Sequence, residues 1–185
     1  MKITEKIISK NNVECFRVNF ATEIKIPKKK QFRFISTFPF NTIEILAHII
    51  EQVGDLDECI LSYSAISKKA IDFIKNALES GKIKKLYFFV AFKIKKDKPK
   101  LVEELSKLVE LYKGRFFATL LSIHSKIMCC KSGKDFYVLE GSGNISTNAR
   151  IEQYLFENKK NSYDVHKSWM ISLDQFENDE EYLVL

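Results

Sequence analysis

The stretch ECILSYSAISKKAIDFIKNALESGKIKKLYFFVAF, residues 58–92, decides the fold class. It contains two apolar segments, 58–63 and 85–92, whose length and composition are typical of buried β-strands. Between them, Ser67 is a favourable N-cap for an amphipathic helix that stops at Gly81. A strand, a helix and a strand in this order predict a βαβ unit with two parallel strands.

The same alternation continues towards the C-terminus. After Pro99 we expect a helix that ends at Gly114, followed by a third strand at 115–123. Residues 124–131 and 136–140 then form two strands joined by a short hairpin turn, and residues 145–156 form a helix, or a helix and a strand. These elements predict an α/β fold, an α/β/α sandwich with a mixed, mostly parallel sheet.

The N-terminal part of the chain is less regular. Alternation over 13–20 and apolar residues at 32–35 suggest strands, and Asn41 is a plausible N-cap for a helix at 42–53. Because no linker, repeat or low-complexity segment interrupts the chain, we expect a single domain over 1–185, with 1–54 packed on the remainder. Residues 1–54 are equally consistent with a dimerisation element, a substrate lid or an extension of the core.

The composition excludes several protein classes. The chain has 185 residues, of which 45% are hydrophobic and 29% charged, which is too apolar for a disordered chain. The longest apolar run, 86–92, is far shorter than the roughly 20 residues of a membrane helix, and the N-terminus lacks the apolar segment of a secretory signal. We therefore expect a cytoplasmic protein without stable membrane association.

The cysteines do not form a recognisable site. No CxxC pair occurs among Cys15, Cys59, Cys129 and Cys130, and the spacing suits neither a zinc site nor a disulfide framework. Buried thiols in a reducing compartment are the simpler interpretation.

The basic charge has two interpretations. A net charge of +6 and a pI of about 9.0 favour polyanionic partners such as nucleic acid. Lysines cluster at 25–30 and at 93–100, and an acidic tail follows at 174–181. However, the basic residues are almost all lysine, which an A/T-rich genome would also produce, and arginine is the better bidentate phosphate ligand.

Two short motifs carry the chemistry. In His124-Ser125-Lys126 the imidazole and the ammonium are two residues apart, and so on the same face of a strand. Gly141-Ser142-Gly143-Asn144 follows the next strand. Because a hairpin joins the two strands, both motifs come to one edge of the sheet, where a nitrogen nucleophile or base meets the donors that a phosphoryl group requires.

The segment HSKIMCCKSGKDFYVLEGSGN resembles the signature of the phospholipase D superfamily, His-x-Lys, an Asp and then Gly-Ser-x-Asn. The resemblance implies a phospholipase D-like α/β sandwich whose core spans about 55–157. It also implies phosphodiester transfer in two steps, without a metal or cofactor, in which one histidine attacks phosphorus and a second protonates the leaving oxygen. By motif position, the catalytic residues are His124, Lys126 and Asn144, with Glu152 as the acid that orients the histidine, and Gly141 and Ser142 bind the phosphate.

The sequence departs from that pattern in two ways. Lys131 stands where the family's Asp usually follows, and the hairpin is about three residues longer, with Asp135 inside it. The chain also carries only one such motif, and neither His48 nor His166 has a lysine at the matching offset. The resemblance therefore implies a homodimer with one composite site built from two half-sites.

These observations predict a metal-independent phosphodiesterase, most simply a nuclease that acts on DNA or RNA. Three alternatives stay open: a catalytically idle nucleic-acid-binding or regulatory module on the same fold, a phospholipid phosphodiesterase, and an α/β domain in which the motif is a coincidence. The sequence does not indicate the strand or base preference of a nucleic-acid substrate.

Overall fold

The βαβ unit forms as the sequence predicts. The structure is a computed structural model that describes residues 5–10, 13–37, 39–148, 150–173 and 183–185. In it, β5 (Glu58–Tyr63) and β6 (Leu86–Ala91) are parallel neighbours connected through α2 (Lys68–Glu79). The side chain of Ser67 accepts a hydrogen bond from the backbone N–H of Ala70 at 3.3 Å, which confirms the predicted cap.

The alternation extends through one more unit and then through a hairpin. A short helix α3 (Ile94–Asp97) precedes α4 (Pro99–Leu111), and β7 (Phe116–Leu121) lies parallel to β6. The hairpin consists of β8 (Lys126–Ser132) and β9 (Asp135–Gly141). The strands β7, β8 and β9 each lie within two residues of their predicted bounds, whereas α3 was not predicted.

The described residues of the segment at 145–156 contain no helix, so the predicted helix is wrong. It contains the two-residue strand β10 (Thr147–Asn148) and the first part of β11 (Glu152–Asn158). Strand β11 fills the space between β9 and β3 (Gln31–Ser36) and pairs antiparallel with both. Tyr154 and Phe156 point into the core at the period of two that a strand requires, but the apolar Leu155 between them conceals this pattern in the sequence.

The N-terminal segment joins the same sheet. It comprises β1 (Glu5–Lys10), β2 (Val13–Val18), the 3-10 turn η1 (Ala21–Glu23), β3, the short β4 (Phe40–Asn41) and α1 (Ile43–Val53). After β11 come α5 (Lys160–Ile171) and β12 (Leu183–Val184). The acidic tail expected at 174–181 lies outside the described residues.

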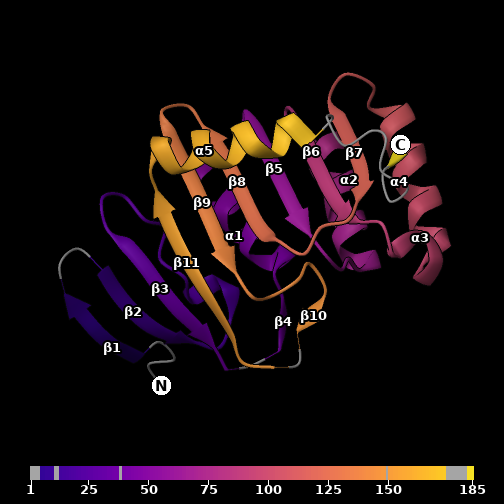
Figure 1. The fold of residues 1–185 in the computed structure, drawn as a ribbon. Helices are drawn as coiled ribbons and strands as arrows, with labels where there is room; N and C mark the ends of the chain where they lie inside the picture. Colours follow the sequence, from indigo (N-terminus) through magenta and orange to yellow (C-terminus); the bar gives the residue numbers. More distant parts are fainter. Residues whose placement is uncertain (1–4, 11–12, 38, 149, 174–182) are drawn as a thin grey trace.

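Ten strands form one sheet in the order β1-β2-β3-β11-β9-β8-β5-β6-β7-β12 (Figure 1). Only three of the nine strand pairings are parallel, β2 with β3, β5 with β6 and β6 with β7, so the prediction of a mostly parallel sheet is wrong. The physical reason is the length of the connections. A parallel crossover needs a dozen or more residues, and short turns or loops join β8, β9 and β11 instead.

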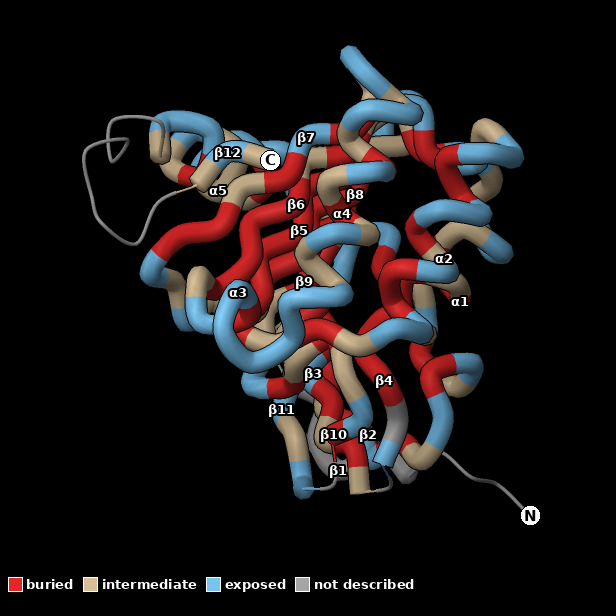
Figure 2. The backbone as a smooth tube through the Cα atoms, turned by 90° about the vertical axis from the view of Figure 1, so that its right-hand side faces the viewer, coloured by how far each residue is buried: buried red, intermediate tan, exposed pale blue. Residues whose placement is uncertain are grey.

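Helices cover both faces of the sheet. Helices α1, α2 and α4 pack on one face and contribute to a large apolar core, while α5 crosses the other face above β8 and β9 (Figure 1). The backbone of the central strands is almost entirely buried (Figure 2). The described cysteines carry free thiols, and Cys59, Cys129 and Cys130 are buried, as expected. Within the described residues, no helix is long and apolar enough to cross a membrane.

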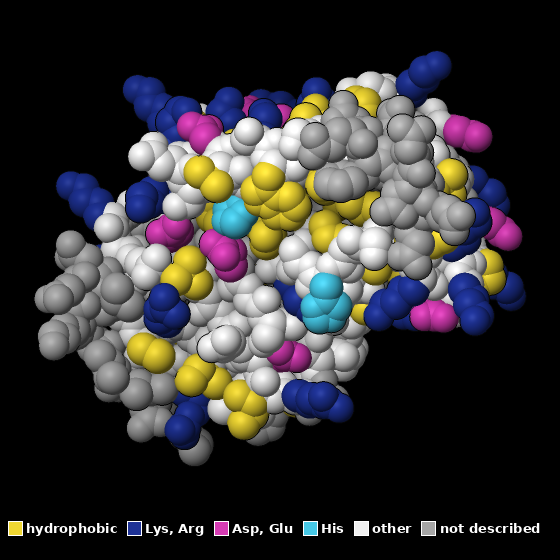
Figure 3. Space-filling view, in the orientation of Figure 1, with side chains coloured by type: hydrophobic (Ala, Val, Ile, Leu, Met, Phe, Trp, Pro, Cys, Tyr) yellow, Lys and Arg dark blue, Asp and Glu magenta, His cyan; other side chains and the backbone are white. Residues whose placement is uncertain are grey.

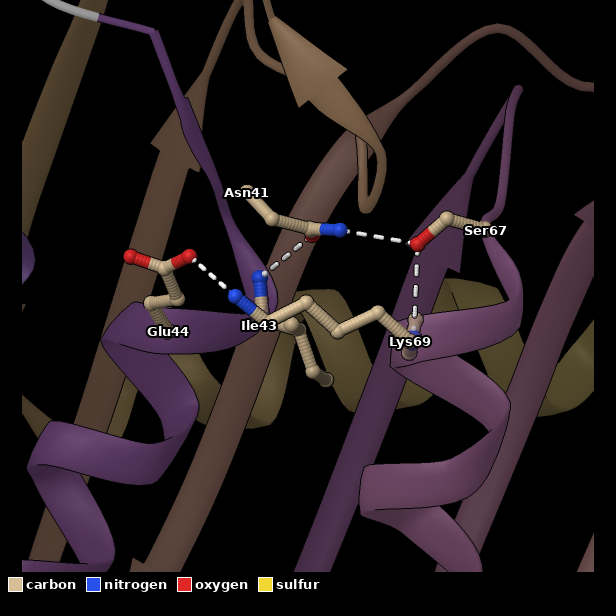
Figure 4. A network of polar contacts seen from close by, with 6 residues as sticks. Asn41, Ile43, Glu44, Ser67 and Lys69 are labelled. Atoms are coloured by element: carbon tan, nitrogen blue, oxygen red, sulfur yellow. Dashed lines mark hydrogen bonds and ion pairs between the residues drawn. The ribbon is translucent and has the colours of Figure 1, made fainter.

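Asn41 connects the amino ends of two helices (Figure 4). Its side-chain oxygen accepts a hydrogen bond from the N–H of Ile43 at 3.1 Å, and its amide donates to the Ser67 hydroxyl at 2.8 Å. An ion pair between Lys69 and Glu44, at 2.5 Å, joins the same helices on the surface. The N-cap of α1 is Thr42 rather than the predicted Asn41, which lies one residue earlier and holds α2 in place beside the loop that carries Asn144.

Candidate active site

The motif residues meet at one edge of the sheet. Strands β5, β6, β7 and β9 end at this edge, and β8 and β11 begin there, because each runs antiparallel to a neighbour that ends there. In α/β sheets, ligands bind outside the carboxyl ends of the parallel strands. We call this side of the molecule the site edge.

His124 lies in the loop before β8 rather than on the strand. The hydroxyl of Ser125 makes a short hydrogen bond to the hydroxyl of Ser62 at the end of β5, and this contact fixes the loop against the sheet. His124 is exposed and Lys126 half-buried. The Lys126 ammonium donates to the His124 carbonyl oxygen at 2.6 Å, and it lies 3.1 Å from Nδ1 and 3.3 Å from Nε2 of the same residue. The two side chains are therefore adjacent, although not because they alternate along a strand.

A cleft of about 440 Å³ opens beside this pair. The residues that line it are His124, Ser125, Lys126, Ile127, Glu140, Gly141 and Ser142. Four predicted site residues, His124, Lys126, Gly141 and Ser142, thus share one hollow. Asn144 and Glu152 are not part of its lining.

Asn144 lies next to the cleft, at the end of β5. Its Oδ1 accepts hydrogen bonds from the Ser64 hydroxyl at 2.9 Å and from the Ala65 N–H at 3.0 Å. Because a backbone N–H can only donate, the orientation of the carboxamide is determined. Its Nδ2 group makes no hydrogen bond with any described residue, so the amide has a donor available for an incoming oxyanion.

Glu152 contacts Ser142 rather than His124. The Ser142 hydroxyl makes a short hydrogen bond to the Glu152 carboxylate and accepts one from the Gln153 N–H at 3.1 Å. Among the described residues, no hydrogen bond joins Glu152 to His124 within one chain. The acid that the family resemblance assigns to orienting the histidine instead positions the serine.

The glycines of the loop are required by close packing. A Cβ at Gly143 would lie 2.0 Å from the Tyr154 hydroxyl, and a Cβ at Gly141 would lie 2.4 Å from Cδ1 of the same ring. The N–H groups of Ser142 and Asn144 donate to the Gln153 carbonyl and to Asn148 Oδ1, each at 3.0 Å. Two of the loop's N–H groups are therefore used within the chain and are not available to bind a phosphate.

Electrostatics favour an anion near Lys126. Partial burial lowers the pKa of its ammonium below the usual value, and the positive charge of Lys93 lowers the pKa further, while Glu152 opposes both effects. Lys93 precedes α3, so the lysine cluster at 93–100 adjoins the site edge. In the space-filling view, basic side chains gather around α3 and α4 (Figure 3).

A second histidine lies near the cleft, at a place that the sequence did not indicate. His166, on α5, has its Nε2 3.0 Å from Oε1 of Glu140, and its Nδ1 accepts a hydrogen bond from the Trp169 indole at 3.1 Å. Glu140 in turn lines the cleft. The i, i+3 spacing of His166 and Trp169 was the available signal, but it has meaning only once the segment is known to be helical. His48, on α1, is buried and bonds to the Ile24 carbonyl.

Comparison with solved structures supports the fold. The chain is similar to a phosphatidylserine synthase from Haemophilus influenzae Rd KW20 (TM-score 0.56, 14% identity, 88% of this chain and 41% of that one). It is also similar to a polyphosphate kinase from Porphyromonas gingivalis (TM-score 0.55, 20% identity, 77% of this chain and 26% of that one). A third similar structure is TrmBL2, an archaeal chromatin protein (TM-score 0.51, 13% identity, 77% of this chain and 52% of that one).

These similarities show that the chain shares a fold with parts of those proteins and no more than that. The chain spans between about a quarter and about half of the length of those proteins, 26% to 52%. No protein-family model matches the sequence, and no curated protein matches it either. The assignment of chemistry therefore depends on the geometry of the site.

Proposed function

We propose that this protein is a phosphodiesterase that cleaves nucleic acid at the site edge without a metal ion. The observation that carries the proposal is the contact between His124 and Lys126 on the wall of an open cleft. An exposed imidazole beside a fixed ammonium provides a nucleophile and a cationic partner for the phosphoryl oxygens. Ser142, on the same wall, and the free amide donor of Asn144 add neutral donors.

In the proposed reaction, an imidazole nitrogen of His124 attacks phosphorus. A nitrogen–phosphorus bond forms as the bond to the leaving oxygen breaks, and that oxygen takes a proton from a general acid. Water then attacks phosphorus, the nitrogen–phosphorus bond breaks, and the acid recovers its proton from that water. Lys126 and Asn144 stabilise the charge on the phosphoryl oxygens in both steps.

The general acid is expected to come from a second copy of the chain. The sequence has three histidines, and only His124 lines the cleft. His48 is buried on α1, and both ring nitrogens of His166 are engaged. We therefore propose a homodimer in which the two His124 side chains meet at the twofold axis. One of them acts as the nucleophile and the other as the general acid.

Nucleic acid is favoured over phospholipid as the substrate. Lys93 lies close enough to Lys126 to lower its pKa, so the lysine cluster offers further phosphate contacts directly beside the cleft. A polymer with a phosphate on each side of the scissile one can use these contacts. Each of the three similar proteins is named for a phosphate compound or for DNA, which agrees with a phosphate site but does not choose among substrates.

The test is hydrolysis of single- and double-stranded DNA and RNA in the presence of EDTA. The proposal predicts cleavage that EDTA does not affect and that His124→Ala abolishes, with an unchanged circular dichroism spectrum. Lys75→Gln, on the far face of α2, is the control and should retain full activity. Activity that requires Mg²⁺, or that survives His124→Ala, would contradict the proposal.

A catalytically idle nucleic-acid-binding module is the second candidate. The observation in its favour is that the N–H groups of Ser142 and Asn144 are occupied within the chain, which leaves few donors for a transition state. Such a module would bind oligonucleotides with a steep salt dependence and cleave none of them. Cleavage of phosphatidyl lipids in vesicles, without cleavage of nucleic acid, would instead identify a lipid enzyme.

A further inference from the structure

A second hollow of about 450 Å³ lies beside the cleft. It is on the same face of the sheet as α5, over the part of that face that the helix does not cover. We call it the flanking groove, and its lining is Cys15, Arg33, Phe34, Ile35, Glu140, Gly141, Gln153, Tyr154 and Leu155. Glu140 and Gly141 line both hollows. The groove is therefore continuous with the site at which the scissile phosphate is proposed to bind.

The strand register aligns the polar groups of the groove. Glu140 on β9 is opposite Leu155 on β11, which is opposite Arg33 on β3, which is opposite Cys15 on β2. Residues directly opposite each other point to the same face of a sheet, so these four form a row across the groove. The row starts at the cleft and runs away from it.

Arg33 is an unpaired cation at the far side of this row. It is exposed, and its guanidinium makes no hydrogen bond or ion pair with any residue that the structure describes. Strand β3 is three strand spacings from β8, or about 14 Å. Arg33 is thus too far away to contact the phosphate held by Lys126, but it can bind another phosphate farther along a chain.

Glu140, between the two hollows, is held by α5. An indole N–H can only donate, so the bond from Trp169 requires an unprotonated Nδ1 on His166. The proton of the neutral ring is then on Nε2, which donates to Glu140 Oε1 at 3.0 Å. The second carboxylate oxygen has no hydrogen-bond partner among the described residues. It is available to a donor in the groove, whereas its charge disfavours a phosphate at that point.

We propose that the flanking groove binds the nucleotides next to the scissile phosphate of a single-stranded nucleic acid. Glu140 accepts a hydrogen bond from an uncharged donor, a base N–H or a sugar hydroxyl, and Arg33 pairs with a more distant phosphate. This proposal rests on the proposed function and deepens it, because it requires an oligonucleotide that extends across the sheet rather than a mononucleotide or a lipid headgroup.

The experiment uses the full chain with His124→Ala, in EDTA, and measures fluorescence anisotropy of labelled single-stranded DNA and RNA over a range of salt concentrations. Adding Arg33→Gln should weaken binding of a long oligonucleotide and reduce the slope of log K against log salt by about 0.7. The binding of a dinucleotide should not change. Lys75→Gln, which removes one charge on the opposite side of the sheet, is the matched control and should leave the slope unchanged.

Glu140→Ala tests the other half of the groove. Removing a negative charge normally strengthens the binding of a polyanion, so the proposal makes the opposite prediction: binding should weaken about tenfold, because a hydrogen bond to a charged acceptor is lost. Trp169→Phe should weaken binding in the same direction, by less, because it frees the ring of His166. Tighter binding by the Glu140→Ala variant would show that the carboxylate only repels phosphate and would overturn its assigned role.

Three further results would overturn the groove itself. The first is an equal salt slope for the Arg33→Gln and Lys75→Gln variants, and the second is no detectable binding of any oligonucleotide. The third is a dimer that Arg33→Gln dissociates in sedimentation, since a second copy of the chain would then cover the groove. Failure of the proposed function is a separate result, because it appears as hydrolysis that survives His124→Ala while the binding data stand.

Discussion

The ammonium of Lys126 lies 3.1 Å from Nδ1 and 3.3 Å from Nε2 of His124 and donates to the carbonyl oxygen of the same residue at 2.6 Å. A neutral imidazole has one nitrogen lone pair that can accept from such a donor. In the free protein Lys126 therefore contacts His124, and a phosphoryl group that binds in the cleft would contact both side chains at once.

Replacement of Lys126 should separate activity from stability. In Lys126→Met we expect hydrolysis to fall by at least about a hundredfold, because a cationic donor to the phosphoryl oxygens is lost. The free energy of unfolding should stay the same or increase, because partial burial already disfavours the ammonium. Lys131→Met, at the other end of β8, is the matched control, with full activity expected. A large loss of stability in the Lys126→Met variant would mean that this lysine is structural.

The pH dependence should report the environment of Lys126. Its pKa in the folded state is below 10.5, so the cation, and with it the activity, should be lost at a lower pH than for an ordinary lysine. Since the unfolded chain then holds this proton more tightly, Lys126 makes stability rise with pH between its folded pKa and 10.5. Lys93→Gln removes a neighbouring positive charge and should move the alkaline limb of kcat/KM to higher pH. Lys100→Gln should not, and an unshifted limb in Lys93→Gln would contradict the coupling.

The packing of the glycine loop can be tested on its own. Gly143→Ala should destabilise the protein by about 1–3 kcal/mol, because the new Cβ would lie 2.0 Å from the Tyr154 hydroxyl. Tyr154→Phe removes that oxygen, although it also breaks the hydrogen bond to Thr42. Thermal unfolding of the double variant should show less than the sum of the two losses. Simple additivity would mean that Gly143 is not constrained by Tyr154.

The composite site makes a prediction about mixtures. If each site needs a half from both chains, equal amounts of wild-type and His124→Ala protein, allowed to exchange subunits, should have a specific activity well below one half of the wild-type value, towards about one quarter. The same mixture, assayed before the subunits have exchanged, should retain one half of the wild-type specific activity. Activity of one half after full exchange would show that each chain works alone.

The parts of the fold that follow from local signals could be predicted from the sequence. The β5–α2–β6 unit, its cap at Ser67 and the β8–β9 hairpin each have a pattern within a few residues of chain. The antiparallel insertion of β11 between β9 and β3 does not, because it depends on pairing between segments more than a hundred residues apart. Helix α5 was missed because only Tyr163 and Met170 are buried along it, too few to produce a helical period.

The same distinction holds at the site. The sequence places His124, Lys126 and Ser142 together correctly, because the hairpin brings the start of β8 beside the end of β9. It could not indicate that Glu152 bonds to Ser142, which depends on where β11 starts, or that Glu140 is held from α5. Contacts of that kind are set by the tertiary structure and leave no pattern in a single amino-acid sequence.

The most direct test of the central claim is to identify the residue that becomes phosphorylated. The protein is incubated with a single-stranded oligonucleotide in EDTA, quenched with base, which preserves phosphohistidine, and digested for peptide mass spectrometry. The account predicts a phosphodiester adduct on His124 that appears and decays with turnover and is absent from the His124→Ala variant. Cleavage that proceeds with an adduct on another residue, or with none at any time, would contradict it.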